Sequence, residues 1–218
     1  MDAEFWLQRW NEGRTGFHRG EVMPLLEKHW PSLGVPSGGK VFVPLAGKSL
    51  DMHWLAAQGH PVLGAELSPR AVQAFFAEAG LQPAIERDAE GVHHRAGSID
   101  LVQGDVFDLS DATLAGIDAV YDRAALIALP PELRRRYVGE VYGRLPTGCR
   151  GLLITLEYPQ AQKDGPPFSV EEAEVRGLFT PRWRVELLQR REILAHEPGF
   201  QAEGVTALAT AVYRLERL

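Results

Sequence analysis

The chain has 218 residues, 45% of them hydrophobic and 24% charged, which is the composition of one globular domain with a sizeable core. A net charge of −6 argues against an extended nucleic-acid-binding surface, and the N-terminus lacks the long apolar stretch of a signal peptide. No run approaches the roughly 18 to 20 apolar residues of a membrane span, and the single cysteine cannot form an internal disulfide, so we expect a cytoplasmic monomer without nucleic-acid or membrane partners.

Apolar runs and helical patterns alternate along the chain. Residues 1–39 contain no strand pattern and are expected to pack as helices over the ligand-binding edge of the sheet. Apolar, β-branched runs predict strands at residues 40–45, 61–67, 99–103, 118–121, 151–157, 185–194 and 207–215. Helices are predicted at residues 50–58, at 68–80 with Ser68 as the N-cap, at 131–145, and after a capping box at 169–172.

Strands that alternate with helices and end in two closely spaced strands predict an α/β fold with a mainly parallel sheet. Nothing in the sequence indicates a linker, so residues 1–218 are predicted to form one domain, a helical lid segment (1–39) followed by an α/β core (40–218). Such sheets bind ligands beyond the carboxyl ends of their strands, which selects the loops after Leu45, Leu67, Gln103, Tyr121 and Glu157.

The first of these loops contains Gly47-Lys48-Ser49, the last three residues of a nucleotide-binding P-loop. A P-loop also requires a glycine five positions before Gly47, but that position is Phe42, inside an apolar run. A dinucleotide-binding Gly-x-Gly-x-x-Gly is absent as well. The spacing therefore argues against both a phosphate cradle and a dehydrogenase.

Two acids at the predicted ligand edge indicate a nucleoside instead. Glu66 ends the second strand, nineteen positions after Gly47, where an acid in this topology binds ribose hydroxyls; alternatively it is an exposed acid beside a helix start. Asp105 follows the third strand and either meets the amino group of an adenine or is a turn aspartate. Adenosine recognition without a phosphate site suggests S-adenosylmethionine.

Five segments occur in order along the chain: FWLQRWNEGRTGFH (5–18), VFVPLAGKS (41–49), GAELS (64–68), YDRAAL (121–126) and GPPF (165–168). Together they resemble the thiopurine S-methyltransferase family of bacterial type. The resemblance implies a class I S-adenosylmethionine-dependent methyltransferase fold, Rossmann-like, with a seven-stranded mainly parallel sheet and helices on both faces. It also implies methyl transfer to the sulfur of a small thiol or thione acceptor such as a thiopurine, and bacterial members are linked to selenium and tellurium compounds.

The resemblance also assigns roles to individual residues. Phe17 matches an aromatic that borders both cofactor and substrate, and the Asp105-Val106 region matches the adenine-side contact. The chain departs from the family at Ala46, where cysteine is usual, and no counterpart of the substrate-side arginine of mammalian members is found near residues 196–200. The contacts implied for S-adenosylmethionine are Trp10, Leu45, the backbone at Gly47, Glu66 and Arg123.

Arg123 is the predicted catalytic residue. It directly follows the fourth strand, where a guanidinium can orient the acceptor, stabilise its anionic form or bind the cofactor carboxylate. The alternative is a structural ion pair with Asp122 or a nearby acid. Trp6, Trp10 and Phe17 are either an aromatic lid that attracts a sulfonium or core residues at helical spacing.

Five further features are interpreted from their sequence context. Phe168, in the stiff Gly-Pro-Pro-Phe loop, is predicted to cover the acceptor, and His18 either relays a proton or packs within the lid. The pair at 93–94 is interpreted as a connector without a metal site, and the basic run at 134–136 as a solvated helix face. Cys149 is assigned a packing or loop role, not a nucleophilic one.

Two other functions compete with thiopurine methylation. A related enzyme can use halide or small-thiol acceptors on the same scaffold, and a non-catalytic protein can bind S-adenosylmethionine as a sensor. The intact Arg123 and the complete lid segment argue against the second.

Lys48 distinguishes the two interpretations of the first loop. If the loop is not a phosphate cradle, the Lys48 side chain points to solvent, and Lys48→Ala leaves the affinity for S-adenosylmethionine nearly intact. Isothermal titration calorimetry of both proteins measures this. A large loss of affinity in the variant is the result expected of a P-loop lysine, and it would contradict a loop that binds no phosphate.

Overall fold

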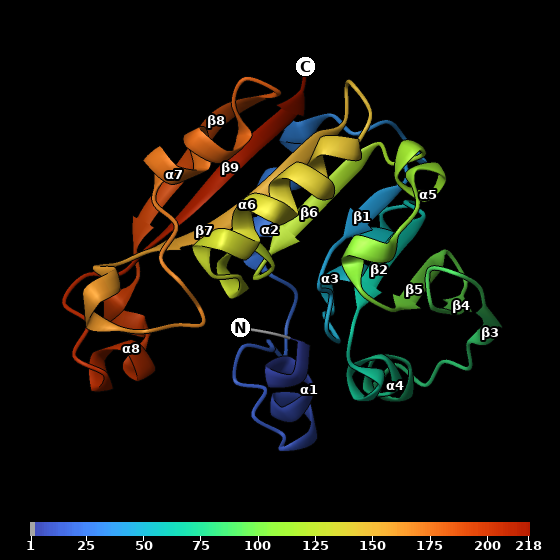
Figure 1. The fold of residues 1–218 in the computed structure, drawn as a ribbon, viewed down its shortest axis with the longest axis horizontal. Helices are drawn as coiled ribbons and strands as arrows, with labels where there is room; N and C mark the ends of the chain where they lie inside the picture. The colour runs from blue at the N-terminus through green and yellow to red at the C-terminus, as the bar shows by residue number, and fades with distance from the viewer. Residues whose placement is uncertain (1–2) are drawn as a thin grey trace.

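The predicted strands pair into one sheet at the centre of the computed structural model, which describes residues 3–218 (Figure 1). Nine strands are hydrogen-bonded in the order β3-β4-β5-β2-β1-β6-β7-β9-β8. The strands are β1 (Val41–Val43), β2 (Val62–Glu66), β3 (Ala84–Arg87), β4 (Val92–Ala96), β5 (Ile99–Gln103), β6 (Ala119–Arg123), β7 (Arg150–Glu157), β8 (Trp183–Glu192) and β9 (Ala209–Arg217). The seven predicted strands are thus all present, and the hairpin β3–β4 is added at one edge.

The five central strands run parallel. In β5-β2-β1-β6-β7 the register places Phe42 of β1 beside Leu63 of β2 and Val120 of β6, and all three side chains are buried. Strands buried on both faces are continuously apolar, which is why their positions follow from the sequence. At the far edge, β9 lies antiparallel between β7 and β8.

Helices cover both faces of the sheet, as the predicted fold class requires. One hydrophobic cluster joins the sheet to α5, α6 and α7, and the second joins it to α2, α3 and α4. Ser68 caps α4 as predicted, because its side chain accepts a hydrogen bond of 3.3 Å from the Ala71 amide. The helices are α1 (Ala3–Asn11), α2 (Pro24–Leu33), α3 (Asp51–Ala57), α4 (Pro69–Glu78), α5 (Asp111–Ala115), α6 (Pro131–Glu140), α7 (Glu172–Phe179) and α8 (Pro198–Ala202).

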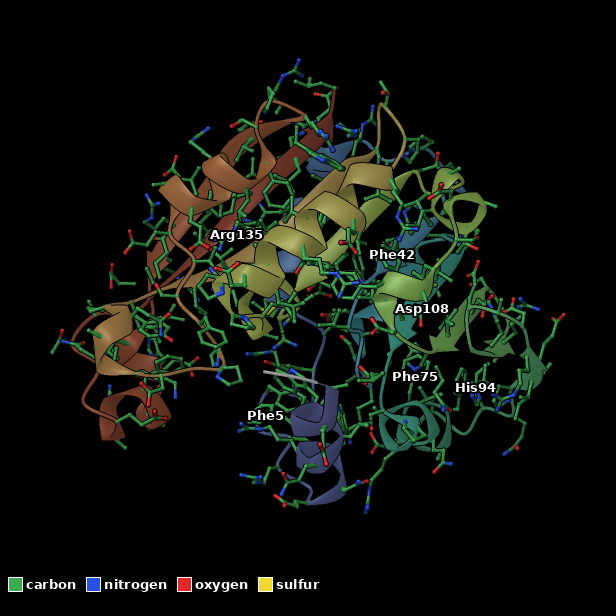
Figure 2. All side chains as sticks on the ribbon, in the orientation of Figure 1. Phe5, Phe42, Phe75, His94, Asp108 and Arg135 are labelled. Atoms are coloured by element: carbon green, nitrogen blue, oxygen red, sulfur yellow. The ribbon has the colours of Figure 1, made fainter. Side chains whose placement is uncertain are left out.

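The prediction of a connector around residues 93–94 is wrong, because these residues lie in β4. The side chains of β4 are mostly polar and do not alternate cleanly between polar and apolar, so the periodicity of a strand is hidden in the sequence. His93 lies 3.2 Å from a carboxylate oxygen of Asp88 and 3.0 Å from one of Asp100. His94 packs near Phe76 of α4, with ring centroids 6.0 Å apart; Figure 2 shows its position on the hairpin side of the molecule.

The capping box predicted at residues 169–172 is also wrong. Helix α7 begins at Glu172 with Glu171 as the N-cap. The hydroxyl of Ser169 instead accepts a hydrogen bond of 2.9 Å from the Tyr158 amide, so it joins two parts of the β7–α7 connection. The helix start is therefore displaced by a tertiary contact that competes for the serine.

The solvated face predicted for residues 134–136 is confirmed for two residues and wrong for the first. Arg135 and Arg136 are exposed and form ion pairs within α6. The Arg134 side chain is only 1% exposed, and its Nη1 lies 2.6 Å from Glu174 Oε1. Within residues 3–218, no helix has both the length and the apolar character needed to cross a membrane.

A buried carboxylate organises the connection from β6 to α6. Asp122 is fully buried, and its Oδ2 accepts hydrogen bonds from the hydroxyls of Tyr137 (2.8 Å) and Tyr142 (3.0 Å). Its Oδ1 accepts from the Leu126 amide at 3.0 Å. Between Asp122 and Leu126 the chain turns through Ala124, whose φ of 69° lies in the left-handed region. Burial raises the pKa of Asp122, while the hydrogen bonds oppose that shift.

Tyr142→Phe removes one donor from this carboxylate and keeps the ring in place. We expect the free energy of unfolding to fall by about 1.5–3 kcal/mol, because a buried charged acceptor loses a partner. Urea denaturation measures the change. The matched control is Tyr213→Phe, whose hydroxyl donates to Glu157, an acceptor that Arg190 also binds. Equal losses in the two variants would contradict the role assigned to Asp122.

Candidate active site

The loops after the parallel strands open at one edge of the sheet, and the N-terminal segment lies across that edge. Figure 1 shows α1 beyond the carboxyl ends of the strands, apart from the two helix layers. Helix α1 contacts α4 through a hydrogen bond of 3.3 Å from Arg70 Nη1 to the Asn11 carbonyl. Figure 2 labels Phe5 on α1 and Phe75 on the neighbouring α4. Helix α2, in contrast, belongs to the core.

The first loop is built from left-handed backbone. Leu45 has a φ of 47° and Gly47 a φ of 57°, so two residues within three turn the chain sharply from β1 towards α3. Strand β1 therefore ends at Val43, two residues before the predicted end. A non-glycine residue such as Leu45 rarely adopts this conformation, and such residues cluster at ligand sites.

Glu66 and Gly47, both predicted to contact S-adenosylmethionine, are joined by a hydrogen bond. Glu66 Oε2 accepts from the Gly47 amide at 2.8 Å, and Oε1 accepts from the Ser68 amide at 2.7 Å. The residue is 7% exposed, so the alternative of an exposed acid is wrong. Burial raises the pKa of Glu66, and the backbone donors lower it by a smaller amount. Each oxygen retains further acceptor capacity, which fits the hydroxyl donors of a ribose.

Trp10 packs directly on this loop. A Cβ atom added at Gly47 would lie 3.3 Å from Trp10 Cζ2, so the ring packs tightly against this glycine. Trp10 is 5% exposed, and its ring centroid lies 5.5 Å from that of Phe17. Phe17 in turn lies 5.7 Å from Trp6. The structure thus joins the three predicted aromatic residues into one cluster against the first loop.

Arg123 ends β6 at the same edge. Its Nη2 donates a weak hydrogen bond of 3.4 Å to the Phe17 carbonyl. The alternative ion pair with Asp122 is not formed, because successive strand residues face opposite sides and Asp122 points into the core. Among residues 3–218, no carboxylate lies within salt-bridge distance of Arg123. The structure places Arg123 against the lid segment, with no carboxylate partner in the described part of the chain.

His18 and Lys48 lie near one another at this edge. Burial lowers the pKa of His18, and Lys48 lowers it further, so the imidazole is neutral near neutral pH. His18 also lines a hollow of about 440 Å³ formed by the lid segment. Lys48 does not point freely to solvent as predicted: its Nζ lies 2.5 Å from Glu78 Oε1, and its side chain is 17% exposed.

Asp51 is a site residue that the sequence interpretation missed. It is 2% exposed. Its Oδ1 accepts from the Met23 amide at 2.8 Å, and its Oδ2 accepts from the Tyr121 hydroxyl at 2.9 Å. It therefore ties Met23, at the start of α2, to Tyr121 of β6, two residues before Arg123. In sequence it resembles any acid in the first turn of a helix, so no local signal distinguishes it.

On the adenine side, the backbone geometry is that of a turn. Asp105 is exposed, and its Oδ1 accepts from the Phe107 amide at 3.1 Å, which starts the short helical turn Val106–Asp108. Val106 is buried below it. The Asp105 side chain therefore has a structural role here, and the adenine contact of the Asp105-Val106 region stays a prediction.

Phe168 and the β6–α6 connection are joined. The Phe168 amide donates to the Ile127 carbonyl at 2.7 Å. Its ring packs so closely on Gly165 that a Cβ there would lie 2.6 Å from the ring.

Within residues 3–218, no group of three or more metal-ligating side chains is present.

Glu66→Gln keeps the shape of the side chain and removes its charge. We expect the affinity for S-adenosylhomocysteine near neutral pH to fall about tenfold or more, because hydrogen bonds to a charged acceptor contribute about 1.5–3 kcal/mol. In the unsubstituted protein the affinity should also fall as pH drops through the raised pKa of Glu66, above 4.5, because the carboxylate becomes protonated.

Calorimetric titrations at several pH values measure both effects. The pH step should be absent from Glu66→Gln and present in Glu21→Gln, a control at an exposed acid of the lid segment. An unchanged pH profile in Glu66→Gln would assign the step to another group.

The comparisons with known proteins agree with this geometry. The family model described as "Thiopurine S-methyltransferase (TPMT)" matches residues 1–218. A thiopurine S-methyltransferase of Xanthomonas campestris pv. campestris is 61% identical over 217 residues, covering 100% of both chains. One of Nitrosomonas eutropha is 61% identical over 218 residues, covering 100% of this chain and 99% of that one.

Solved structures share the fold at low identity. A Burkholderia thailandensis 1,6-didemethyltoxoflavin-N1-methyltransferase with bound S-adenosylhomocysteine has a TM-score of 0.66 at 17% identity, over 99% of this chain and 86% of that chain. A mycolic acid cyclopropane synthase complexed with S-adenosylhomocysteine has a TM-score of 0.63 at 10% identity, over 88% and 83%. These likenesses place the sheet among the class I S-adenosylmethionine-dependent methyltransferase folds, and the full-length matches show that the chain belongs to the thiopurine S-methyltransferase family.

Proposed function

We propose that the protein transfers the methyl group of S-adenosylmethionine to the sulfur of thiopurines or related aromatic and heterocyclic thiols. The observation that carries the proposal is the 61% identity, over the full length, with proteins named for that activity. The arrangement of Glu66, Trp10 and Arg123 around one sheet edge supports it. Selenium or tellurium compounds are proposed as further acceptors, because they present similar nucleophilic chalcogens.

The cofactor is proposed to lie across the first loop. Glu66 would hold the ribose hydroxyls, with the backbone at Leu45 and Gly47 beside it. Trp10 would close the site from the lid side, and the turn at Asp105-Val106 would border the adenine. When bound, S-adenosylmethionine supplies an electrophilic methyl group on a sulfonium, which passes to the acceptor sulfur by in-line displacement.

Arg123 is proposed to act on the acceptor. It is partly buried, and no carboxylate among residues 3–218 is within salt-bridge distance of it, so its charge is available to a thiolate or to the cofactor carboxylate. A thiopurine sulfur is readily anionic near neutral pH, so a strong general base is not required. His18, whose pKa is lowered by burial and by the charges of Lys48 and Arg123, is proposed to take the proton of an acceptor that arrives protonated.

The remaining contribution is positioning and exclusion of water. The aromatic cluster of Trp6, Trp10 and Phe17 would cover the reacting atoms from one side, and Phe168 from another. Holding two reactants in line can lower a barrier by about 7–11 kcal/mol in favourable cases. The proposed catalysis therefore rests on orientation of the two reactants and requires no metal.

The acceptor is tested with the unmodified protein and a parallel panel of 6-mercaptopurine, iodide and selenite-derived acceptors, with S-adenosylhomocysteine formation as the measurement. The proposal expects turnover with 6-mercaptopurine well above that with iodide. Preference for iodide would favour the halide alternative. Binding of S-adenosylmethionine without turnover of any acceptor would favour a sensor.

Arg123→Ala is expected to lower kcat/KM for 6-mercaptopurine about 100-fold, the scale seen when one stabilising donor is removed from a reacting charge. Arg123→Lys should recover only part of the loss, because lysine lacks the planar fork. Steady-state kinetics measures both. Arg14→Ala, at an exposed arginine of the lid segment, is the matched control and should keep its activity. Unchanged kinetics in Arg123→Ala would remove this residue from the site.

A further inference from the structure

We propose that Arg134 is a positioning residue that holds Phe168 in place against the loop carrying Arg123, and so shapes the acceptor side of the pocket. The inference rests on the proposed function, because it concerns how the acceptor is bound. No sequence feature marks Arg134, which stands in a run of three arginines.

The first step is the burial of Arg134. Its two neighbours in the run are exposed, but Arg134 itself is 1% exposed. Taking a guanidinium out of water is unfavourable unless its donors are paired. A helix in this position could present an apolar residue to the core instead. The contacts of Arg134 therefore indicate what it does.

The second step is the set of partners. Nε donates to the Leu129 carbonyl at 3.1 Å, within the connection from β6 to α6. Nη1 donates to the Ser169 carbonyl at 3.4 Å and pairs with Glu174 Oε1 at 2.6 Å. These three acceptors belong to three segments: the β6–α6 connection, the β7–α7 connection and α7. A planar guanidinium can bond in several fixed directions at once, which a single ammonium cannot do with the same geometry.

The third step is Phe168, which adjoins this junction. The Arg134 Cζ lies 5.9 Å from the centroid of the Phe168 ring, over its face. The Phe168 amide donates to the Ile127 carbonyl at 2.7 Å, on the connection that Arg134 also binds. Because Ser169 directly follows Phe168, the hydrogen bond from Arg134 to the Ser169 carbonyl also fixes the backbone that follows Phe168.

The fourth step links this junction to Arg123. The same β6–α6 connection is fixed at its start by the bond from the Leu126 amide to Asp122, the residue before Arg123. Arg123 and Phe168, the two acceptor-side residues proposed above, are thus supported by one short segment. Arg134 fastens that segment to the Phe168 loop, so it sets the distance between the two.

The test uses the full-length protein with Arg134→Lys, and Arg135→Lys as the matched control at the exposed neighbour. The primary measurement is amide hydrogen exchange, resolved by NMR at Phe168 and Ser169. Arg134→Lys should exchange about tenfold faster or more at these amides, because their local opening becomes easier. The Gly47 amide, bonded to Glu66, should keep its rate. Arg135→Lys should match the unsubstituted protein at all three amides.

The second measurement separates the two substrates. With Arg134→Lys, KM for 6-mercaptopurine should rise about tenfold, because a loosened Phe168 weakens binding of the acceptor in the ground state and transition state alike. The dissociation constant of S-adenosylhomocysteine should stay within about twofold, since no bond of Arg134 reaches the first loop. If Arg134→Lys does not fold, Glu174→Gln replaces it, because that variant weakens the anchoring of Arg134 and keeps the guanidinium.

The exchange rates decide the inference and the turnover of the unsubstituted protein decides the proposed function, so the two failures are distinguishable. Unchanged exchange at Phe168 would overturn the inference, as would an equal acceleration at Gly47, which would indicate general destabilisation. An unchanged KM for the acceptor would overturn it as well. Absence of turnover in the unsubstituted protein would refute the proposed function and leave the exchange result to decide the role of Arg134.

Discussion

The hydrogen bond from the Gly47 amide to the Glu66 carboxylate is the interaction on which this site depends. It joins the loop after β1 to the end of β2, and the other carboxylate oxygen caps the backbone that leads into α4. Burial makes the ionised carboxylate unfavourable, as its raised pKa indicates, so the backbone donors are needed to retain it. The glycine that donates the bond also leaves room for the Trp10 ring, and a single loop therefore connects two strands and the lid segment.

A second buried acid has the corresponding role at β6. Asp122 also accepts a backbone amide from the loop that follows its strand, but two tyrosine hydroxyls satisfy its remaining capacity. No acceptor capacity needs to face a ligand there, and the strand alternation turns the next residue, Arg123, outward. One acid thus keeps acceptor capacity at the sheet edge, while the other fixes the connection that follows Arg123. The same chemistry leaves acceptor capacity open in one place and produces rigidity in the other.

The parts that the sequence predicted are those governed by local or periodic rules. The five central strands were recognisable because buried parallel strands are continuously apolar, and the start of α4 because Ser68 and Pro69 are local capping signals. Glu66 could be placed because its separation from Gly47 is fixed by the length of one helix and one strand. The family resemblance added Trp10 and Phe17, and the structure brings them together. Their roles in binding stay predictions.

The parts that were missed are decided by partners distant in sequence. The hairpin β3–β4 is polar because it lies at the sheet edge, and Glu90 in its turn accepts from the Ser110 amide (3.1 Å) and the Thr113 hydroxyl (2.7 Å). Gly104, just before Asp105, lies so near this turn that a Cβ would be 2.5 Å from the Glu90 carbonyl. An apparent connector therefore supports the loop predicted to border the adenine.

Arg134 illustrates the same limit from the opposite direction. A charged residue in a charged run is expected in water, and helical periodicity alone cannot show that one of three arginines faces the core. What places it there is the set of acceptors that the fold brings together from residues 129, 169 and 174. Because those acceptors are separated by up to 45 positions in the chain, the reason for the arginine exists only after folding. Residues of this kind are where a structure adds most to a sequence, and here the residue found in this way adjoins the acceptor side of the site.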